Sequence, residues 1–189
     1  MITVVSGLPR SGTSLMMQML EAGGMSVLAD GARCADTTNP RGYYELEAVK
    51  RLPRDLSWLD QAEGRAVKVV SPLLRHLPTG RHYRVVFMTR SMADVLASQA
   101  TLLLERGVAT RAADGDVAQA FARHLEEVRA WLGRQDHLEV LHMAFEAVLA
   151  DPISEARRVA GFVGGELNAA RMAAAVLPEL SRYRSGTPG

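Results

Sequence analysis

Hydrophobic and polar positions alternate along the chain in two periods, one typical of strands and one typical of helices. Short apolar runs rich in β-branched residues predict buried strands at 2–6, 66–70 and 83–89, with a weaker one at 138–143. Apolar residues at helical spacing predict helices at 14–22, 91–106, 116–134, 144–150, 153–163 and 167–180. The predicted strands at 2–6, 83–89 and 138–143 are thus each followed by a predicted helix.

Strands that alternate with helices form βαβ units, and the strands of such units pair in parallel. Helices then cover both faces of the sheet. The pattern therefore predicts an α/β fold with three layers, built around a central, mostly parallel sheet. A length of 189 residues suits a single domain over 1–189.

One long segment, 29–64, interrupts the alternation. It contains DGARCADTTNPRGYYEL, with glycines, a proline and acidic residues, and only one short helical pattern, from about Glu45 to Leu52. A long irregular stretch inside a compact domain is usually functional or disordered. The paired tyrosines, Tyr43 and Tyr44, argue against disorder, so we interpret 29–64 as a substrate loop or lid.

Composition and charge narrow the function only slightly. Hydrophobic residues make up 48% of the chain and charged residues 23%, as in ordinary globular proteins. A net charge of +1 gives no global field that would favour nucleic acid or an acidic membrane. Twenty of the 22 basic residues are arginine, which suits an anion binder because the guanidinium grips planar oxyanions, although genome composition produces the same bias.

The sequence carries no sign of export or membrane insertion. A single cysteine, Cys34, cannot form an internal disulfide, which fits a reducing cytoplasm. The N-terminus lacks the basic region and apolar core of a signal peptide. No apolar run approaches the roughly 20 residues that a membrane span requires. We therefore expect a cytoplasmic protein without a membrane span.

The segment GLPRSGTS, which follows the first strand, is close to the phosphate-binding P-loop G-x-x-x-x-G-K-[ST]. Gly7 and Gly12 have the P-loop spacing, but Thr13 and Ser14 follow directly, without the lysine. An arginine, Arg10, stands earlier in the loop. Backbone N–H groups of such a loop bind phosphate whatever reaction follows. Its place between a strand and a helix makes the predicted fold P-loop NTPase-like.

The residues at the strand ends decide which phosphate chemistry the loop supports. A kinase or NTPase holds Mg²⁺ with the P-loop hydroxyl and an aspartate at a strand end, and the P-loop lysine adds charge. Here the strand ends are Val70-Ser71 and Thr89-Arg90, and neither supplies the aspartate. The loop therefore suits a lone terminal phosphate, while Arg90 indicates a second anionic group. Two separated phosphates bound without a metal describe 3′-phosphoadenosine-5′-phosphosulfate (PAPS).

At this point the sequence resembles the PAPS-dependent sulfotransferase family, in three stretches that follow the family's order from residue 2 to about 165. PRSGTS resembles the loop that wraps the 5′-phosphosulfate, and RSMADVLAS keeps the family's spacing between an arginine and a serine that reach the 3′-phosphate. FEAVLADPISEARRVAGFVGG is similar to a late segment of the family. The resemblance implies PAPS as co-substrate, no metal, and these cofactor-binding residues: Arg10, Ser11, Gly12, Thr13, Ser14, Arg90 and Ser98.

Sulfuryl transfer requires a base for the acceptor proton and positive charge near the transferring group. In cytosolic members of the family, one strand ends in Lys-Thr-His-x-Pro, and its histidine is the base. This chain keeps the lysine as Lys68 but has Val70 at the histidine position. That departure makes the chain similar to the protein-tyrosine and glycan sulfotransferases, in which a glutamate after the P-loop helix takes the proton.

The candidates for this base are Glu45, Asp36 and Asp30, with His76 in reserve. We favour Glu45, because NPRGYYEL combines a turn, two aromatic rings that can wall an acceptor, and a carboxylate at the start of a helix, where it remains ionised. Lys68 would stabilise the leaving oxygen if its side chain faces the site.

The sequence therefore predicts metal-independent transfer of a sulfuryl group from PAPS to a hydroxyl or amine of a small-molecule or glycan acceptor. Two alternatives stay open. One is a small-molecule kinase with a degenerate P-loop, and the other is a non-catalytic module that binds a nucleotide or a partner. The missing histidine and the faint match of SRYRSG to the family's Arg-Lys-Gly favour the module somewhat. Neither the acceptor nor the oligomeric state can be read from the sequence.

Overall fold

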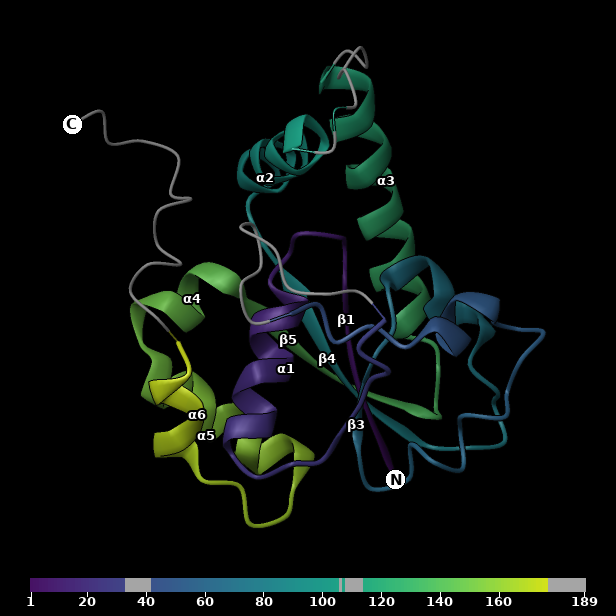
Figure 1. The fold of residues 1–189 in the computed structure, drawn as a ribbon. Coiled ribbons are helices and arrows are strands. Elements are labelled where there is room, and N and C mark those ends of the chain that lie inside the picture. Colours follow the sequence, from purple (N-terminus) through teal and green to yellow (C-terminus); the bar gives the residue numbers. More distant parts are fainter. Residues whose placement is uncertain (33–41, 106, 108–113, 177–189) are drawn as a thin grey trace.

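The computed structural model describes residues 1–32, 42–105, 107 and 114–176 (Figure 1). Five strands form one sheet in the order β2-β3-β1-β4-β5, and every neighbouring pair is parallel. The strands are β1 (Ile2–Gly7), β2 (Val27–Leu28), β3 (Ala66–Lys68), β4 (Tyr83–Thr89) and β5 (Leu138–Ala144). This parallel sheet with its covering helices confirms the predicted α/β fold.

The central strands β1 and β4 are mostly apolar, and most of their residues are buried. In β1, Ile2 and Val4 point into one hydrophobic core and Val5 points into the other. In β4, Phe87 belongs to the first core and Val86 to the second. Parallel strands that are buried on both faces are expected to be nearly continuous hydrophobic runs.

One face of the sheet is covered by the helix that follows β1 and by three helices near the C-terminal end of the described chain (Figure 1). The methionines of the first of these helices, Met16, Met17 and Met19, are fully buried against this face. The helices are α1 (Thr13–Ala22), α4 (Phe145–Ala150), α5 (Pro152–Val163) and α6 (Ala169–Ala174).

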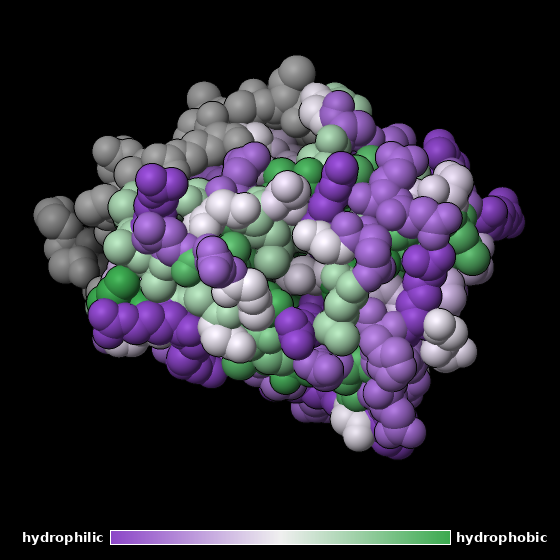
Figure 2. Space-filling model, turned by 90° about the horizontal axis from the view of Figure 1, so that it is seen from below, coloured by the Kyte–Doolittle hydropathy of each residue, from purple (hydrophilic) through white to green (hydrophobic). Residues whose placement is uncertain are grey.

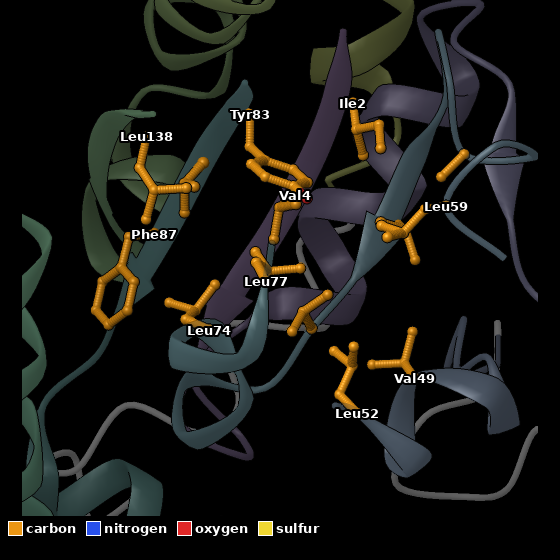
Figure 3. Packing of buried hydrophobic residues seen from close by; sticks show 14 of the residues in the cluster. Ile2, Val4, Val49, Leu52, Leu59, Leu74, Leu77, Tyr83, Phe87 and Leu138 are labelled. Atoms are coloured by element: carbon orange, nitrogen blue, oxygen red, sulfur yellow. The ribbon is translucent and has the colours of Figure 1, made fainter. Parts of the chain in front are cut away.

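The opposite face carries the first core, which Figure 3 shows in close-up. Residues of η1 (Glu47–Arg51) and η2 (Ser71–His76) pack there with α3 (Asp114–Leu132). Tyr83 and Phe87 of β4 belong to the same cluster as Leu74 of η2 and Val49 of η1. Because η1 belongs to the irregular segment after β2, part of that segment is fixed to the sheet by apolar packing. The remaining helix, α2 (Met92–Glu105), follows β4.

Several element boundaries differ from those predicted. The third strand ends at Lys68 instead of residue 70, and the helix expected from Glu45 is a short 3₁₀ helix. The two-residue strand β2 and the 3₁₀ helix η2 were not predicted, because elements of a few residues leave too little periodicity to recognise. The last predicted helix, 167–180, is observed as Ala169–Ala174 within the described residues.

The surface mixes polar and apolar residues. On the face seen from below, hydrophilic residues interrupt the hydrophobic ones across the whole view (Figure 2). Among the helices in the described parts of the chain, none combines the length and the apolar character needed to cross a membrane.

Candidate functional site

The loop between β1 and α1 is a tight turn that only glycine permits at both ends. A Cβ on Gly7 would lie 2.4 Å from Ser11 Oγ and 2.5 Å from the carbonyl oxygen of Met88 on the neighbouring strand. Gly12 has a φ of 98°, in the left-handed region. A Cβ there would lie 2.5 Å from Cδ2 of Phe145. The spacing of the two glycines is therefore required by backbone packing as well as by any ligand.

The first turn of α1 presents backbone donors at the carboxyl edge of the sheet. Gly12 is the N-cap, and among the described residues no side chain caps the helix there. The first N–H groups of an α-helix have no partner within the helix. Thr13 and Ser14 begin α1. Their N–H groups and the helix dipole can therefore bind an anion.

Arg10 connects the loop to the middle of α2. Its backbone has a φ of 70°, which is uncommon for a residue with a side chain. The guanidinium Nε donates a hydrogen bond of 2.8 Å to Ser98 Oγ on α2. A terminal nitrogen of Arg90 donates to the Arg10 carbonyl oxygen at 3.4 Å. The structure thus brings together three residues that were predicted as cofactor ligands from separate stretches of the sequence.

Arg90 lies directly after β4 in a packed environment. Its side chain is only 5% exposed, and its Nε is 3.9 Å from a carboxylate oxygen of Asp94. The guanidinium carbon lies 4.4 Å from the centre of the Phe145 ring, which is cation–π geometry. The guanidinium is therefore held by a charge, a ring and a carbonyl oxygen.

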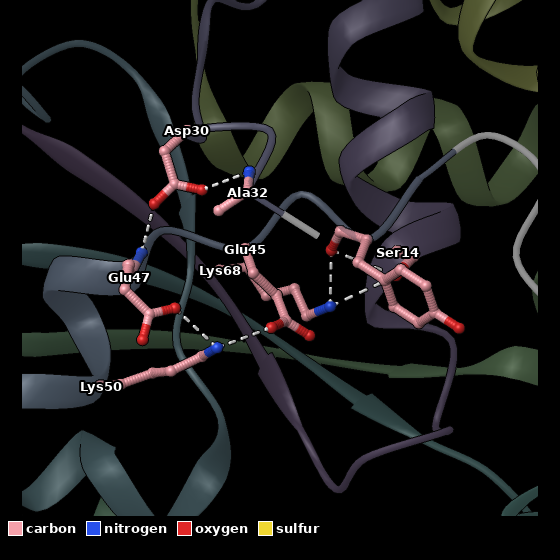
Figure 4. A network of polar contacts seen from close by, with 8 residues as sticks. Ser14, Asp30, Ala32, Glu45, Glu47, Lys50 and Lys68 are labelled. Carbon is pink, nitrogen blue, oxygen red and sulfur yellow. Dashed lines mark hydrogen bonds and ion pairs between the residues drawn. The ribbon is translucent and has the colours of Figure 1, made fainter. Parts of the chain in front are cut away.

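Lys68 points from the end of β3 toward the start of α1 (Figure 4). Its Nζ donates hydrogen bonds to the Tyr43 carbonyl oxygen at 2.7 Å and to Ser14 Oγ at 3.3 Å. Ser14 Oγ also donates to the same carbonyl at 3.4 Å. The ammonium group thus lies beside the P-loop hydroxyl, on the side of the sheet where the loop turns into the helix.

Glu45 follows Tyr43 by two residues and belongs to the same network of polar contacts (Figure 4). Its side chain is 21% exposed, and one carboxylate oxygen is 3.2 Å from Lys50 Nζ. Lys50 also contacts Glu47, and these hydrogen bonds, first that to Glu47 and then that to Glu45, raise the pKa of Lys50. Glu45 therefore lies on the segment whose Tyr43 carbonyl oxygen contacts both Lys68 and Ser14.

The other candidate bases differ from Glu45 in their surroundings. Asp30 accepts backbone hydrogen bonds from Glu47 and Ala32, one on each carboxylate oxygen, and these bonds lower its pKa. A carboxylate held in this way braces the loop and is a weaker base than an ordinary aspartate. His76 is exposed at the end of η2. Asp36 lies outside the described residues, as do Cys34 and the C-terminal SRYRSG.

Three features of the site were not anticipated from the sequence. They are the Tyr43 carbonyl that binds Lys68, the contact of Phe145 with both Gly12 and Arg90, and a hydrogen bond of 2.9 Å between Ser71 Oγ and His124 Nε2. Burial and, secondly, the nearby Arg75 lower the pKa of His124. A sequence pattern could not reveal these contacts, because they join residues that are far apart along the chain.

No group of three or more histidine, cysteine or acidic side chains in the described parts of the chain is arranged to hold a metal ion.

Comparison with known proteins places the chain in a family. A model of the family described as "Sulfotransferase domain" matches residues 2–178. No curated protein matches the chain in sequence.

Solved structures with the same fold include three described as sulfotransferases. The sulfotransferase domain of the Synechococcus PCC 7002 olefin synthase aligns with a TM-score of 0.59 and 17% identity, over 99% of this chain and 88% of that one. A mouse sulfotransferase complexed with PAP aligns with a TM-score of 0.55 and 16% identity, over 92% of this chain and 61% of that one. A sulfotransferase from Alicyclobacillus acidocaldarius gives 0.52 and 12%, over 86% and 80% of the two chains.

Proposed function

Because this chain belongs to the sulfotransferase-domain family, we propose that it is an enzyme that transfers a sulfuryl group from PAPS to a hydroxyl or amine of a small-molecule or glycan acceptor. The main support is the meeting of Arg10, Arg90 and Ser98 beside the first turn of α1. Two cationic side chains and a helix N-terminus at one edge of the sheet suit a ligand with two separate anionic groups.

The residues fit the two ends of PAPS in the following way. The N–H groups at the start of α1, with Ser11 and Ser14, would hold the 5′-phosphosulfate, since a helix N-terminus favours an anion. Arg90 and Ser98 would hold the 3′-phosphate. A similar fold was solved in complex with PAP, the nucleotide that remains when PAPS loses its sulfuryl group.

The chemistry requires only two further groups. As the acceptor oxygen or nitrogen forms its bond to sulfur, the bond between sulfur and the phosphate oxygen breaks, and the acceptor proton leaves. Glu45 would accept this proton, because it lies two residues after Tyr43, whose carbonyl oxygen contacts both Lys68 Nζ and Ser14 Oγ. Lys68 would stabilise the negative charge that develops on the leaving phosphate oxygen. Sulfated acceptor and PAP are the products.

A first experiment measures which nucleotide stabilises the fold. PAP at about 100 times its Kd should stabilise the folded protein by about 2.7 kcal/mol without added metal, because it binds only the folded state. For a domain of this size that corresponds to an increase in Tm of about 5–10 °C. ATP with Mg²⁺ should stabilise much less. Equal stabilisation by ATP, or a strict need for Mg²⁺, would favour a small-molecule kinase instead.

A second experiment concerns the 3′-phosphate. Arg90→Ala should weaken PAP binding roughly 10- to 100-fold, since a charge-assisted hydrogen bond is lost in a partly desolvated site. The affinity for 5′-AMP, which lacks the 3′-phosphate, should hardly change. Arg81→Ala is a matched control, because it removes an arginine from the opposite end of β4, where Arg81 contacts the exposed Asp60. If Arg90→Ala keeps the wild-type preference for PAP, Arg90 does not bind the 3′-phosphate.

A further inference from the structure

The first two residues of α4 lie beside the residues that follow β4. Strands β4 and β5 pair in parallel with Thr89 opposite Ala144, the last residue of each strand. The next residues along the two chains are therefore Arg90 and Phe145. Side chains of Phe145 and Glu146 both reach across to the β4 end, and neither belongs to the cofactor or catalytic residues proposed above.

Phe145 contacts the two loops that would bind the two ends of the nucleotide. Its side chain is buried, and its ring lies under the guanidinium of Arg90 at 4.4 Å from ring centre to guanidinium carbon. The edge of the same ring occupies the space that a Cβ on Gly12 would need. The ring therefore fixes how far the guanidinium lies from the P-loop.

Glu146 fixes the backbone immediately after Arg90. Its Oε1 accepts a hydrogen bond of 2.8 Å from the backbone N–H of Ser91. The Ser91 hydroxyl in turn accepts a hydrogen bond of 3.2 Å from the backbone N–H of Asp94, whose carboxylate pairs with Arg90. Movement of the Glu146 carboxylate would therefore displace both the backbone and the acidic partner of Arg90.

A free arginine side chain has several rotatable bonds, so immobilising it at the moment of binding reduces affinity. An arginine that is already held in place avoids this loss. Resting on the proposed function, we propose that Phe145 and Glu146 are positioning residues, which hold Arg90 ready for a nucleoside 3′-phosphate and so set the preference for 3′-phosphorylated nucleotides. Phe145 acts through the face of its ring and Glu146 through the Ser91 N–H.

The test compares affinities for PAP and for 5′-AMP, measured by calorimetry on the full chain. Phe145→Leu keeps an apolar side chain but removes the ring, so the ratio of the two affinities should fall about tenfold, a typical effect of losing a cation–π platform that is shielded from water. Phe145→Tyr keeps the ring and should retain the wild-type ratio. Val148→Ala truncates a fully buried side chain of the same helix that packs in the same core, and it should leave the ratio unchanged.

The glutamate offers a second pair of variants that does not disturb the core. Glu146→Ala should lower the ratio, because the Ser91 N–H loses its acceptor. Glu146→Gln retains a carbonyl oxygen that can accept this hydrogen bond, so its ratio of affinities for PAP and 5′-AMP should stay close to the wild-type ratio. If Phe145→Leu fails to fold, the two Glu146 variants alone test whether Arg90 is held in position for the 3′-phosphate.

The possible outcomes separate this inference from the proposed function. Equal loss of affinity for both nucleotides in Phe145→Leu and Glu146→Ala would show a general packing role and overturn the inference. An unchanged ratio in both variants would overturn it as well. A wild-type protein that binds PAP no better than 5′-AMP would contradict the proposed function itself.

Discussion

Glu45→Gln is expected to lower turnover by roughly 10²–10⁴, the usual contribution of a general base. Glutamine has nearly the shape of glutamate and keeps an oxygen near Lys50, but it cannot accept the acceptor proton. The affinity for PAP should hardly change, because the residues proposed to bind the nucleotide lie on the glycine loop, at the end of β4 and on α2. The measurement is single-turnover sulfuryl transfer from labelled PAPS, after a screen of phenols, alcohols and amines has identified an acceptor.

Glu47→Gln is the matched control for this variant. Glu47 lies two residues further along the same segment, also contacts Lys50 and is more exposed than Glu45, so its replacement removes the same charge. Turnover should stay near the wild-type value. Undiminished turnover of Glu45→Gln would move the role of base to Asp36, Asp30 or His76. No turnover by the wild type on any acceptor would favour a module that binds the nucleotide without reaction.

Lys68→Met should lower turnover by roughly 10²–10³, the usual effect of removing one group that stabilises transition-state charge. Methionine keeps the unbranched apolar stem but cannot donate to the Tyr43 carbonyl or to Ser14 Oγ. If Lys68 acts only in the transition state, turnover and turnover divided by KM fall together.

Arg65→Met is the control for this variant. Arg65 is exposed and lies just before the first residue of β3, so the replacement also removes one positive charge, but at the opposite end of the strand. A variant of Lys68 that binds PAP weakly but keeps its turnover at saturation would show that the lysine only holds the nucleotide or the Tyr43 segment. That result would remove Lys68 from the catalytic residues.

The resemblance to sulfotransferases, first drawn from PRSGTS and from the spacing between Arg90 and Ser98, is confirmed by the match over residues 2–178. Short sequence motifs were therefore sufficient to recognise the family. Runs of mostly apolar residues and the spacing of Gly7 and Gly12 can be recognised within a few consecutive residues. The contacts with Met88 and Phe145 that exclude a side chain at these glycines come from distant segments.

The roles of individual site residues were less accessible. The sequence left open whether Lys68 faces the P-loop and which of three carboxylates takes the proton. Folding turns Lys68 toward Ser14 and uses both oxygens of Asp30 for backbone hydrogen bonds. The assignment of Glu45 as the base stays a prediction, supported by its place in the polar network around the P-loop.

The sequence by itself determined the alternation of the longer strands and helices, the parallel sheet and the glycine-bounded loop after the first strand, because periodicity and glycine spacing act over a few residues. Only the tertiary structure decided that Arg10 bonds to Ser98, that the Tyr43 carbonyl binds Lys68 and that Phe145 lies between Gly12 and Arg90. These contacts join distant segments through a carbonyl that every residue carries and through a ring whose neighbours are set by strand pairing. No sequence pattern predicts either kind of contact.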